Sequence, residues 1–121
     1  MSLNSSDKAA VVAKALLRVA ARLSVSDAAL IRIVGLSEAT VSRMRKGTYQ
    51  LKRRDKAFEL GLLLIRLFRS LDAIMGGDES AARAWLRNEN RALGGKPIEL
   101  IETVWGLTNV LAYLDAHRTR A

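Results

Sequence analysis

The stretch Ala28-Ala-Leu-Ile-Arg-Ile-Val-Gly-Leu-Ser-Glu-Ala-Thr-Val-Ser-Arg-Met-Arg-Lys-Gly47 decides the fold of the first half of the chain. It predicts two short helices, 27–34 and 38–46, with Gly35 in the turn between them, because glycine readily takes the positive φ of a tight turn. Ser37 has the side chain of a helix N-cap and is placed to start the second helix. The apolar residues that can hold the two helices together are Leu30, Ile33, Leu36, Val41 and Met44.

Helical periodicity continues on both sides of this stretch. Apolar residues recur at helical spacing over 9–23, and a wider apolar pattern over 54–75 indicates burial on more than one side, between two lobes or in a dimer. A short helix is expected over 78–87. Pro97 fits the first turn of another helix, which Gly106 is expected to break or bend before a last helix. Since no segment has the pattern of a strand, the chain is predicted to be all-α.

The positive charge of the chain lies in its first half. The 121 residues carry 20 Lys and Arg against 12 Asp and Glu, a net charge of +8. Residues 1–57 hold 12 of the cations and 4 of the anions, whereas residues 58–121 hold 8 of each. A basic face attracts nucleic acids, because neutralising their phosphates releases condensed counterions. The split indicates a basic half for a polyanion and a neutral half for another role.

Composition also excludes several classes of function. The chain has no Cys and a single His, His117, so thiolate chemistry, a histidine metal site and a catalytic triad are not expected. No cofactor and no enzymatic activity are predicted, because no cluster of acid, base and nucleophile stands out. The densest apolar run, 60–65, is much shorter than the about 20 residues that a membrane span needs. A cytoplasmic protein is the simplest expectation.

The stretch 28–47 resembles the helix-turn-helix of Cro/C1-type (Xre-like) repressors. The resemblance implies that the helix 38–46 enters the major groove of operator DNA. The sequence departs from the family pattern at Ile31, where a small Ala is usual at the helix crossing, and at Asp27, where a polar residue that contacts phosphate is common. The alternative interpretation of the same residues is an ordinary helical hairpin with a solvated basic face.

This resemblance assigns DNA contacts to polar and basic residues around the helix 38–46. Glu38, Ala39 and Arg43 would read base edges, while Thr40, Ser42 and Lys46 are placed for phosphates. With the capping serine and the basic residues that follow, the expected DNA-binding set is Ser37, Glu38, Ala39, Thr40, Ser42, Arg43, Arg45, Lys46, Lys52, Arg53 and Arg54.

A second motif lies in the run 84–103. Its order and spacing of Trp-Leu, Asn, Leu-Gly-Gly and Pro resemble the toxin-binding domain of the Xre/MbcA/ParS antitoxins. Taken from the residues alone, Asn90 is expected to bond the backbone of a turn and Pro97 to start a helix. The tryptophans Trp85 and Trp105 are both expected in the core. The motif residues expected to be structural are Trp85, Asn90, Leu93, Gly94, Gly95 and Pro97.

Together the two resemblances cover about residues 15–117 in the order of that family, and they imply a type II antitoxin. The implied partner is a RES-domain toxin that degrades NAD, and the antitoxin would repress their shared operon by binding operator DNA as a homodimer. The implied layout is a DNA-binding region over 8–57, a connecting and dimerisation helix over 58–77, and a toxin-binding domain over 78–121.

The toxin contacts are expected on the outward side of the last helix and in the tail. An NAD-degrading site must bind a pyrophosphate and so should present basic groups, with which Asp115 and the terminal carboxylate of Ala121 would pair. The alternative is a solvated tail without a role. The expected toxin-binding residues are Asn109, Tyr113, Asp115, His117, Arg118 and Arg120.

Two other functions fit the same sequence. A DNA-binding repressor whose second half only dimerises would share every feature of the first half, and a toxin gene beside its own gene would argue against it. A helical interaction module without a DNA role would show no salt-dependent DNA binding.

Overall fold

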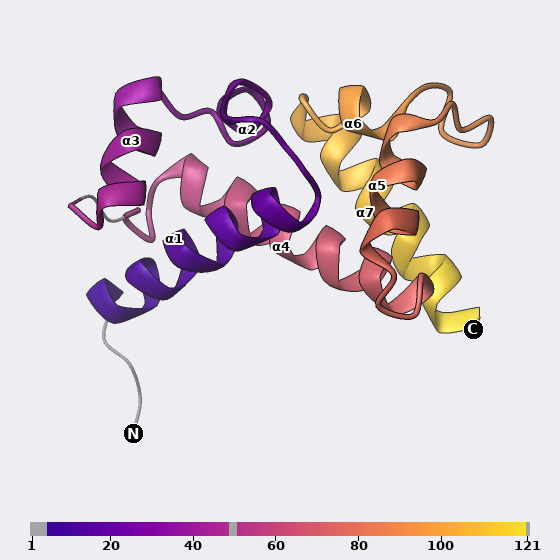
Figure 1. Ribbon diagram of the computed structural model, residues 1–121, viewed down its shortest axis with the longest axis horizontal. Coiled ribbons are helices and arrows are strands. Elements are labelled where there is room, and N and C mark those ends of the chain that lie inside the picture. Colours follow the sequence, from indigo (N-terminus) through magenta and orange to yellow (C-terminus); the bar gives the residue numbers. More distant parts are fainter. Residues whose placement is uncertain (1–4, 49–50, 121) are drawn as a thin grey trace. The chain divides into compact units, whose positions relative to one another are not determined.

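The computed structural model describes the backbone of residues 5–48 and 51–120, and the side chains of residues 8–48 and 51–118. Over these residues the chain forms seven α-helices and no strand, so the predicted all-α class is confirmed. The chain divides into two compact units, residues 1–65 and 66–121, and each is described by itself. Their boundary falls inside the helix α4 (Lys56–Ile74), which Figure 1 shows running through both units.

The first unit consists of α1 (Ser5–Arg22), α2 (Asp27–Val34), α3 (Glu38–Lys46) and the first half of α4 (Figure 1). Helix α3 packs against both α1 and α2. The apolar stripe of α1 is buried as its periodicity predicts, and the most deeply buried large side chains of the unit are Leu16, Leu23, Leu30, Val34, Leu51 and Leu64.

Local signals in the sequence set the ends of α2 and α3. The Ser26 side chain accepts a hydrogen bond from the Ala29 backbone N–H at 3.1 Å and caps α2. Ser37 caps α3 in the same way, by accepting from the Thr40 N–H. Gly35 ends α2 with a φ of 75°, a left-handed conformation that costs glycine little and other residues more. The predicted helix-turn-helix is therefore present with its expected turn.

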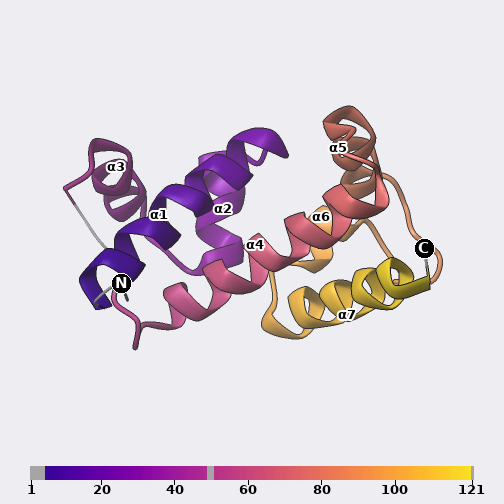
Figure 2. The ribbon, with the colours of Figure 1, turned by 90° about the horizontal axis from the view of Figure 1, so that it is seen from below.

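The second unit consists of the end of α4 and of α5 (Glu79–Arg87), α6 (Pro97–Leu100) and α7 (Val104–Arg120). One side of α7 is buried through Leu107, Val110, Leu111 and Leu114, and the helix lies along the second half of α4 (Figure 2). Each of the largest buried side chains here is at most 1 % exposed, namely Leu67, Leu71, Leu86, Ile101, Leu107 and Leu114.

The predicted break at Gly106 is wrong. The chain turns at residues 101–103, between α6 and α7, and Gly106 lies in the first turn of α7. Thr103 makes this turn possible, because its hydroxyl accepts a hydrogen bond from the Gly106 N–H at 3.0 Å and so acts as an N-cap. A Cβ on Gly106 would lie 1.7 Å from the carbonyl oxygen of Leu100. The glycine is needed for close backbone approach rather than for ending a helix.

The predicted burial of Trp105 is wrong for the same reason. Its indole is 80 % exposed, and the neighbouring Val104 is 60 % exposed. The turn at 101–103 resets the helical phase, so these side chains do not continue the face of Ile101. Because successive residues of a helix are rotated by about 100°, Trp105 points away from the buried side chain of Leu107.

Candidate functional site

Helix α3 presents most of its polar side chains to solvent. Its buried side is formed by Val41 and Met44, which are 1 % and 5 % exposed. The remaining residues, except the half-buried Thr40, are exposed, and they are Glu38, Ala39, Ser42, Arg43, Arg45 and Lys46. Three of the four charges on this face are positive, and all three lie in the last turns of the helix. The geometry is that of a short, well-anchored helix with an exposed polar face.

The start of α3 is ordered by a chain of side-chain hydrogen bonds. Besides capping the helix, the Ser37 hydroxyl donates to the Thr40 hydroxyl at 2.9 Å. The same Thr40 oxygen accepts from the Arg43 guanidinium at 3.4 Å. Thr40, which the sequence places at a phosphate, is thus already engaged within the helix. Its contacts hold the base-reading candidate Arg43 against the helix surface.

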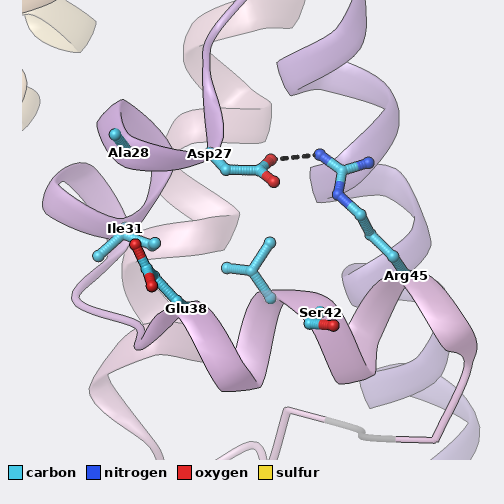
Figure 3. A pocket seen from close by; sticks show the side chains of 7 residues that line it. Asp27, Ala28, Ile31, Glu38, Ser42 and Arg45 are labelled. Atoms are coloured by element: carbon cyan, nitrogen blue, oxygen red, sulfur yellow. Dashed lines mark hydrogen bonds and ion pairs between the residues drawn. The ribbon is translucent and has the colours of Figure 1, made fainter.

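The end of α3 is tied to the start of α2 by one ion pair. The Arg45 guanidinium donates to the Asp27 carboxylate at 2.5 Å, across 18 residues of sequence (Figure 3). Both side chains remain about half exposed, at 48 % and 54 %. An open hollow of about 230 Å³ lies beside the pair, with the buried Val41 among its lining residues. Ala28, Ile31, Glu38 and Ser42 complete the lining, so the bulky Ile31 borders this hollow between α2 and α3.

The basic segment after α3 is anchored at one point. Leu51 is only 1 % exposed, whereas the cations that follow it, Lys52, Arg53 and Arg54, are exposed. The Asp55 carboxylate accepts a hydrogen bond from the Lys52 backbone N–H at 3.3 Å, which closes the turn before α4. A buried leucine therefore fixes a short cationic segment on the surface of the first unit.

In the second unit the residues of the motif 84–103 form a closed loop. Asn90 accepts a hydrogen bond from the Leu93 N–H through its side chain, at 3.1 Å. Its backbone N–H donates to the Gly95 carbonyl at 2.9 Å, and Gly94 has a φ of +81°. Pro97 is buried and begins α6. The structure thus places Asn90, Gly94 and Pro97 in the turn and helix start that the sequence predicts for them.

One side of α7 carries a row of ring contacts that reaches α5. Trp85, on α5, stacks on Tyr113 with ring centroids 6.3 Å apart, and Tyr113 faces His117 at 4.2 Å. His117 Nδ1 donates to the Tyr113 carbonyl oxygen at 2.9 Å. Asn109 is exposed. The side chain of Arg120 and all of Ala121 lie outside the described residues.

The expectation that Asp115 faces outward is wrong. Its carboxylate accepts a hydrogen bond from the Ser70 hydroxyl at 2.5 Å, and Ser70 is only 2 % exposed. The other carboxylate oxygen lies 3.5 Å from the Arg66 guanidinium. Because α7 packs along α4, Asp115 is directed at α4 and is already paired within its own unit.

Two comparisons with protein families cover almost the whole chain. The model of the antitoxin Xre-like helix-turn-helix domain matches residues 2–66, and the model of the antitoxin Xre/MbcA/ParS C-terminal toxin-binding domain matches residues 70–120. The chain belongs to the Xre/MbcA/ParS antitoxin family. No curated protein matches the sequence.

As an Xre/MbcA/ParS antitoxin, the protein is an antitoxin of a toxin–antitoxin system with a DNA-binding helix-turn-helix. The family implies a non-enzymatic regulator whose partners are a toxin and DNA. Within the part of the chain that the structure describes, no three His, Cys, Asp or Glu residues are grouped so that they could hold a metal ion. None of the described helices has the length and apolar character needed to cross a membrane.

Three features of this antitoxin were not found from its sequence. They are the Asp27–Arg45 pair, the Ser70–Asp115–Arg66 contacts and the ring stack of Trp85, Tyr113 and His117. Each joins residues on different helices, and no local spacing identifies such partners; only the Tyr113–His117 contact lies within one helix, at a spacing of four residues on α7. The N-cap at Thr103 is different, because a threonine before a helix is a signal that the sequence did contain.

Proposed function

We propose that this antitoxin binds and neutralises a RES-domain, NAD-degrading toxin, and represses the operon that encodes both proteins. The observation that carries the proposal is the order of the two matched domains, a helix-turn-helix over 2–66 followed by a toxin-binding domain over 70–120. The RES-domain identity comes from the resemblance of the sequence to antitoxins of this kind. Because the protein acts on operon DNA, it would work in the cytoplasm.

In the proposed repressor, α3 lies in the major groove. Ala39 and Arg43 read base edges from the exposed side of α3 away from the buried Val41, and Glu38 does so from the exposed start of the helix. The phosphate contacts come from Ser42, Lys46 and the anchored segment Lys52, Arg53 and Arg54. The proposed DNA-binding set is completed by Ser37 and Thr40 near the start of the helix and by Arg45 near its end. This division assigns sequence selectivity to three residues and salt-dependent affinity to the others.

The protein is proposed to act as a dimer. A single helix-turn-helix makes few base contacts, and a dimer reads two half-sites about one helical turn of DNA apart. The proposed pairing surface is α4, on which the apolar side chain of Leu62 is 39 % exposed. A Leu62→Glu variant that is monomeric by light scattering, while the wild-type protein is a dimer, is the expected result; a monomeric wild-type protein would contradict the proposal.

Toxin binding is assigned to the second unit. The proposed contact residues are Asn109, Tyr113, His117, Arg118 and Arg120, all on α7. Asp115 is removed from this set and is no longer proposed to pair with basic groups of the toxin, because Ser70 and Arg66 already pair with it. We therefore propose three segments with different roles. Residues 8–57 bind DNA, residues 58–77 connect the two parts and form the dimer, and residues 78–121 bind the toxin.

The experiment that tests the proposal is co-expression with the neighbouring reading frame, followed by purification through a tag on the antitoxin. A stable complex, protection of the cells and loss of NAD when the antitoxin is withheld are the expected results. A truncated protein of residues 1–77 tests the division of labour, since it should no longer protect cells. Full repression together with no captured partner would instead favour a repressor whose second half only dimerises.

A further inference from the structure

The second unit contains a hollow that is rich in arginine. It has a volume of about 390 Å³ and is lined by Arg66, Arg69 and Ser70 from α4 and by Asp115 and Arg118 from α7. All five residues belong to one compact unit. The hollow lies outside the helix-turn-helix. Its charge is positive, whereas carboxylates at this end of the chain were expected from the sequence to make the contacts with the toxin.

The charges in this hollow do not balance. Three guanidinium groups line it together with one carboxylate. That carboxylate, of Asp115, has one oxygen bonded to Ser70 and the other paired with Arg66. Among the described residues, neither Arg69 nor Arg118 has an ion-pair partner, and both are exposed at the rim. Two cations are therefore available to a ligand that enters from solvent.

The hollow has a fixed base, which distinguishes it from a loosely solvated basic face. Ser70 is 2 % exposed, and its hydroxyl donates to Asp115 across 45 residues of sequence. This bond joins α4 to α7 at the base of the hollow, and Asp115 also pairs with Arg66 there. Side chains that are already held in place lose less entropy when they bind a ligand.

We propose that this arginine-lined hollow is the docking site for an acidic side chain, Asp or Glu, of the protein partner that the second unit binds. The inference rests on the proposed toxin-binding function and names the charge of the partner surface. A carboxylate matches the planar fork of arginine and can bond to two of its N–H groups at once. Asp115 already makes a carboxylate–arginine contact in the same hollow.

A phosphate of DNA fits this hollow less well. A DNA strand would bring a row of negative charges past the Asp115 carboxylate, whereas an acidic side chain of a protein brings a single one. The unit of residues 66–121 carries 8 Lys and Arg against 7 Asp and Glu, whereas residues 1–65 carry 12 against 5. Long-range electrostatic attraction therefore favours binding of a polyanion to the first unit. The second unit, which is nearly neutral, is suited to a partner whose charge matches it only locally.

The test uses the full-length protein and the product of the neighbouring reading frame as the probe. Arg69→Glu and Arg118→Glu each place a negative charge at the rim without removing the Arg66–Asp115 pair. Each is expected to weaken the complex by about tenfold, and the double variant by more, because like charges then face each other. Arg91→Glu is the matched control, an exposed arginine of the same unit outside the hollow, and should bind within about twofold of wild type.

Three readouts decide the inference. Circular dichroism shows whether each variant is folded, and Arg69→Gln and Arg118→Gln replace any that is not. Restored binding of Arg69→Glu to a partner in which one Asp or Glu is changed to Lys supports the site directly. If the charge-reversed variants bind the partner with unchanged affinity, this inference is overturned but the proposed function is not. A loss of operator affinity in these variants would also overturn the inference, because it would mark the hollow as a phosphate site. A wild-type protein that captures no partner overturns the proposed function as well.

Discussion

Helices α3 and α7 both expose one face, but the two faces differ in charge and in how they are held. The nine residues of α3 carry four charges, and the side chains at its start bond to each other at helical spacing. Residues 104–114 of α7 carry no charge and expose Val104 and Trp105. A charged face suits a polyanion in water, whereas an uncharged face with an exposed indole suits a protein surface. The comparison teaches that the two units are built for different partners.

The largest expected effect is a loss of stability in the second unit, produced by a variant that leaves the contacts of the first unit in place. Gly106→Ala would put a Cβ against the Leu100 carbonyl, a backbone atom that cannot move without displacing α6. We expect a loss of about 3 kcal/mol in the free energy of unfolding, measured by urea denaturation. Gly61→Ala is the matched control, because its Cβ would make an ordinary 3.4 Å contact with Leu16 and alanine favours a helix interior. Equal stability of both variants would contradict the tight turn between α6 and α7.

The Gly106 result also shows what the sequence could and could not predict. Ser37, Gly35 and Pro97 act within a few residues of their own positions, so the ends of their helices were predictable. Trp105 was misplaced because three turn residues shift the helical phase, and periodicity continued across them gives the wrong face. Asp115 was misplaced because its partner Ser70 lies 45 residues away, and only the packing of α7 on α4 brings them together.

The next effect tests the charged face. Arg43→Ala is expected to cost about 1–3 kcal/mol of affinity for the DNA upstream of the gene and to relax selectivity at one base pair. Lys52→Ala should instead weaken all sequences alike and lower the slope of log affinity against log salt by about one unit. Fluorescence anisotropy over a salt series measures both. If the two variants lost affinity in the same way on operator and random DNA, Arg43 would be a phosphate contact.

A smaller effect is expected at the Asp27–Arg45 pair. Asp27→Asn releases Arg45, so affinity for random DNA should rise severalfold, with a steeper salt dependence. The free energy of unfolding should fall by no more than about 1 kcal/mol, because the pair is half exposed. Glu59→Gln is the control, since it changes the net charge equally and frees Lys56 while Arg45 stays paired. A rise of the same size in both variants would mean that total charge, and not the freed Arg45, determines binding.

The smallest effect on stability should occur at the largest exposed side chain. Trp105→Ala removes an indole that is 80 % exposed, so little apolar area returns to water and the free energy of unfolding should change by less than about 0.5 kcal/mol. Leu107→Ala, two residues further along α7, removes a fully buried side chain and should cost about 2–5 kcal/mol. Similar losses in both variants would mean that α7 is rotated from the orientation described. Because stability is unchanged, a loss of partner affinity in Trp105→Ala would directly measure a contact at the uncharged face. That loss can be compared with the loss of partner affinity in the charge-reversed arginine variants of the same unit.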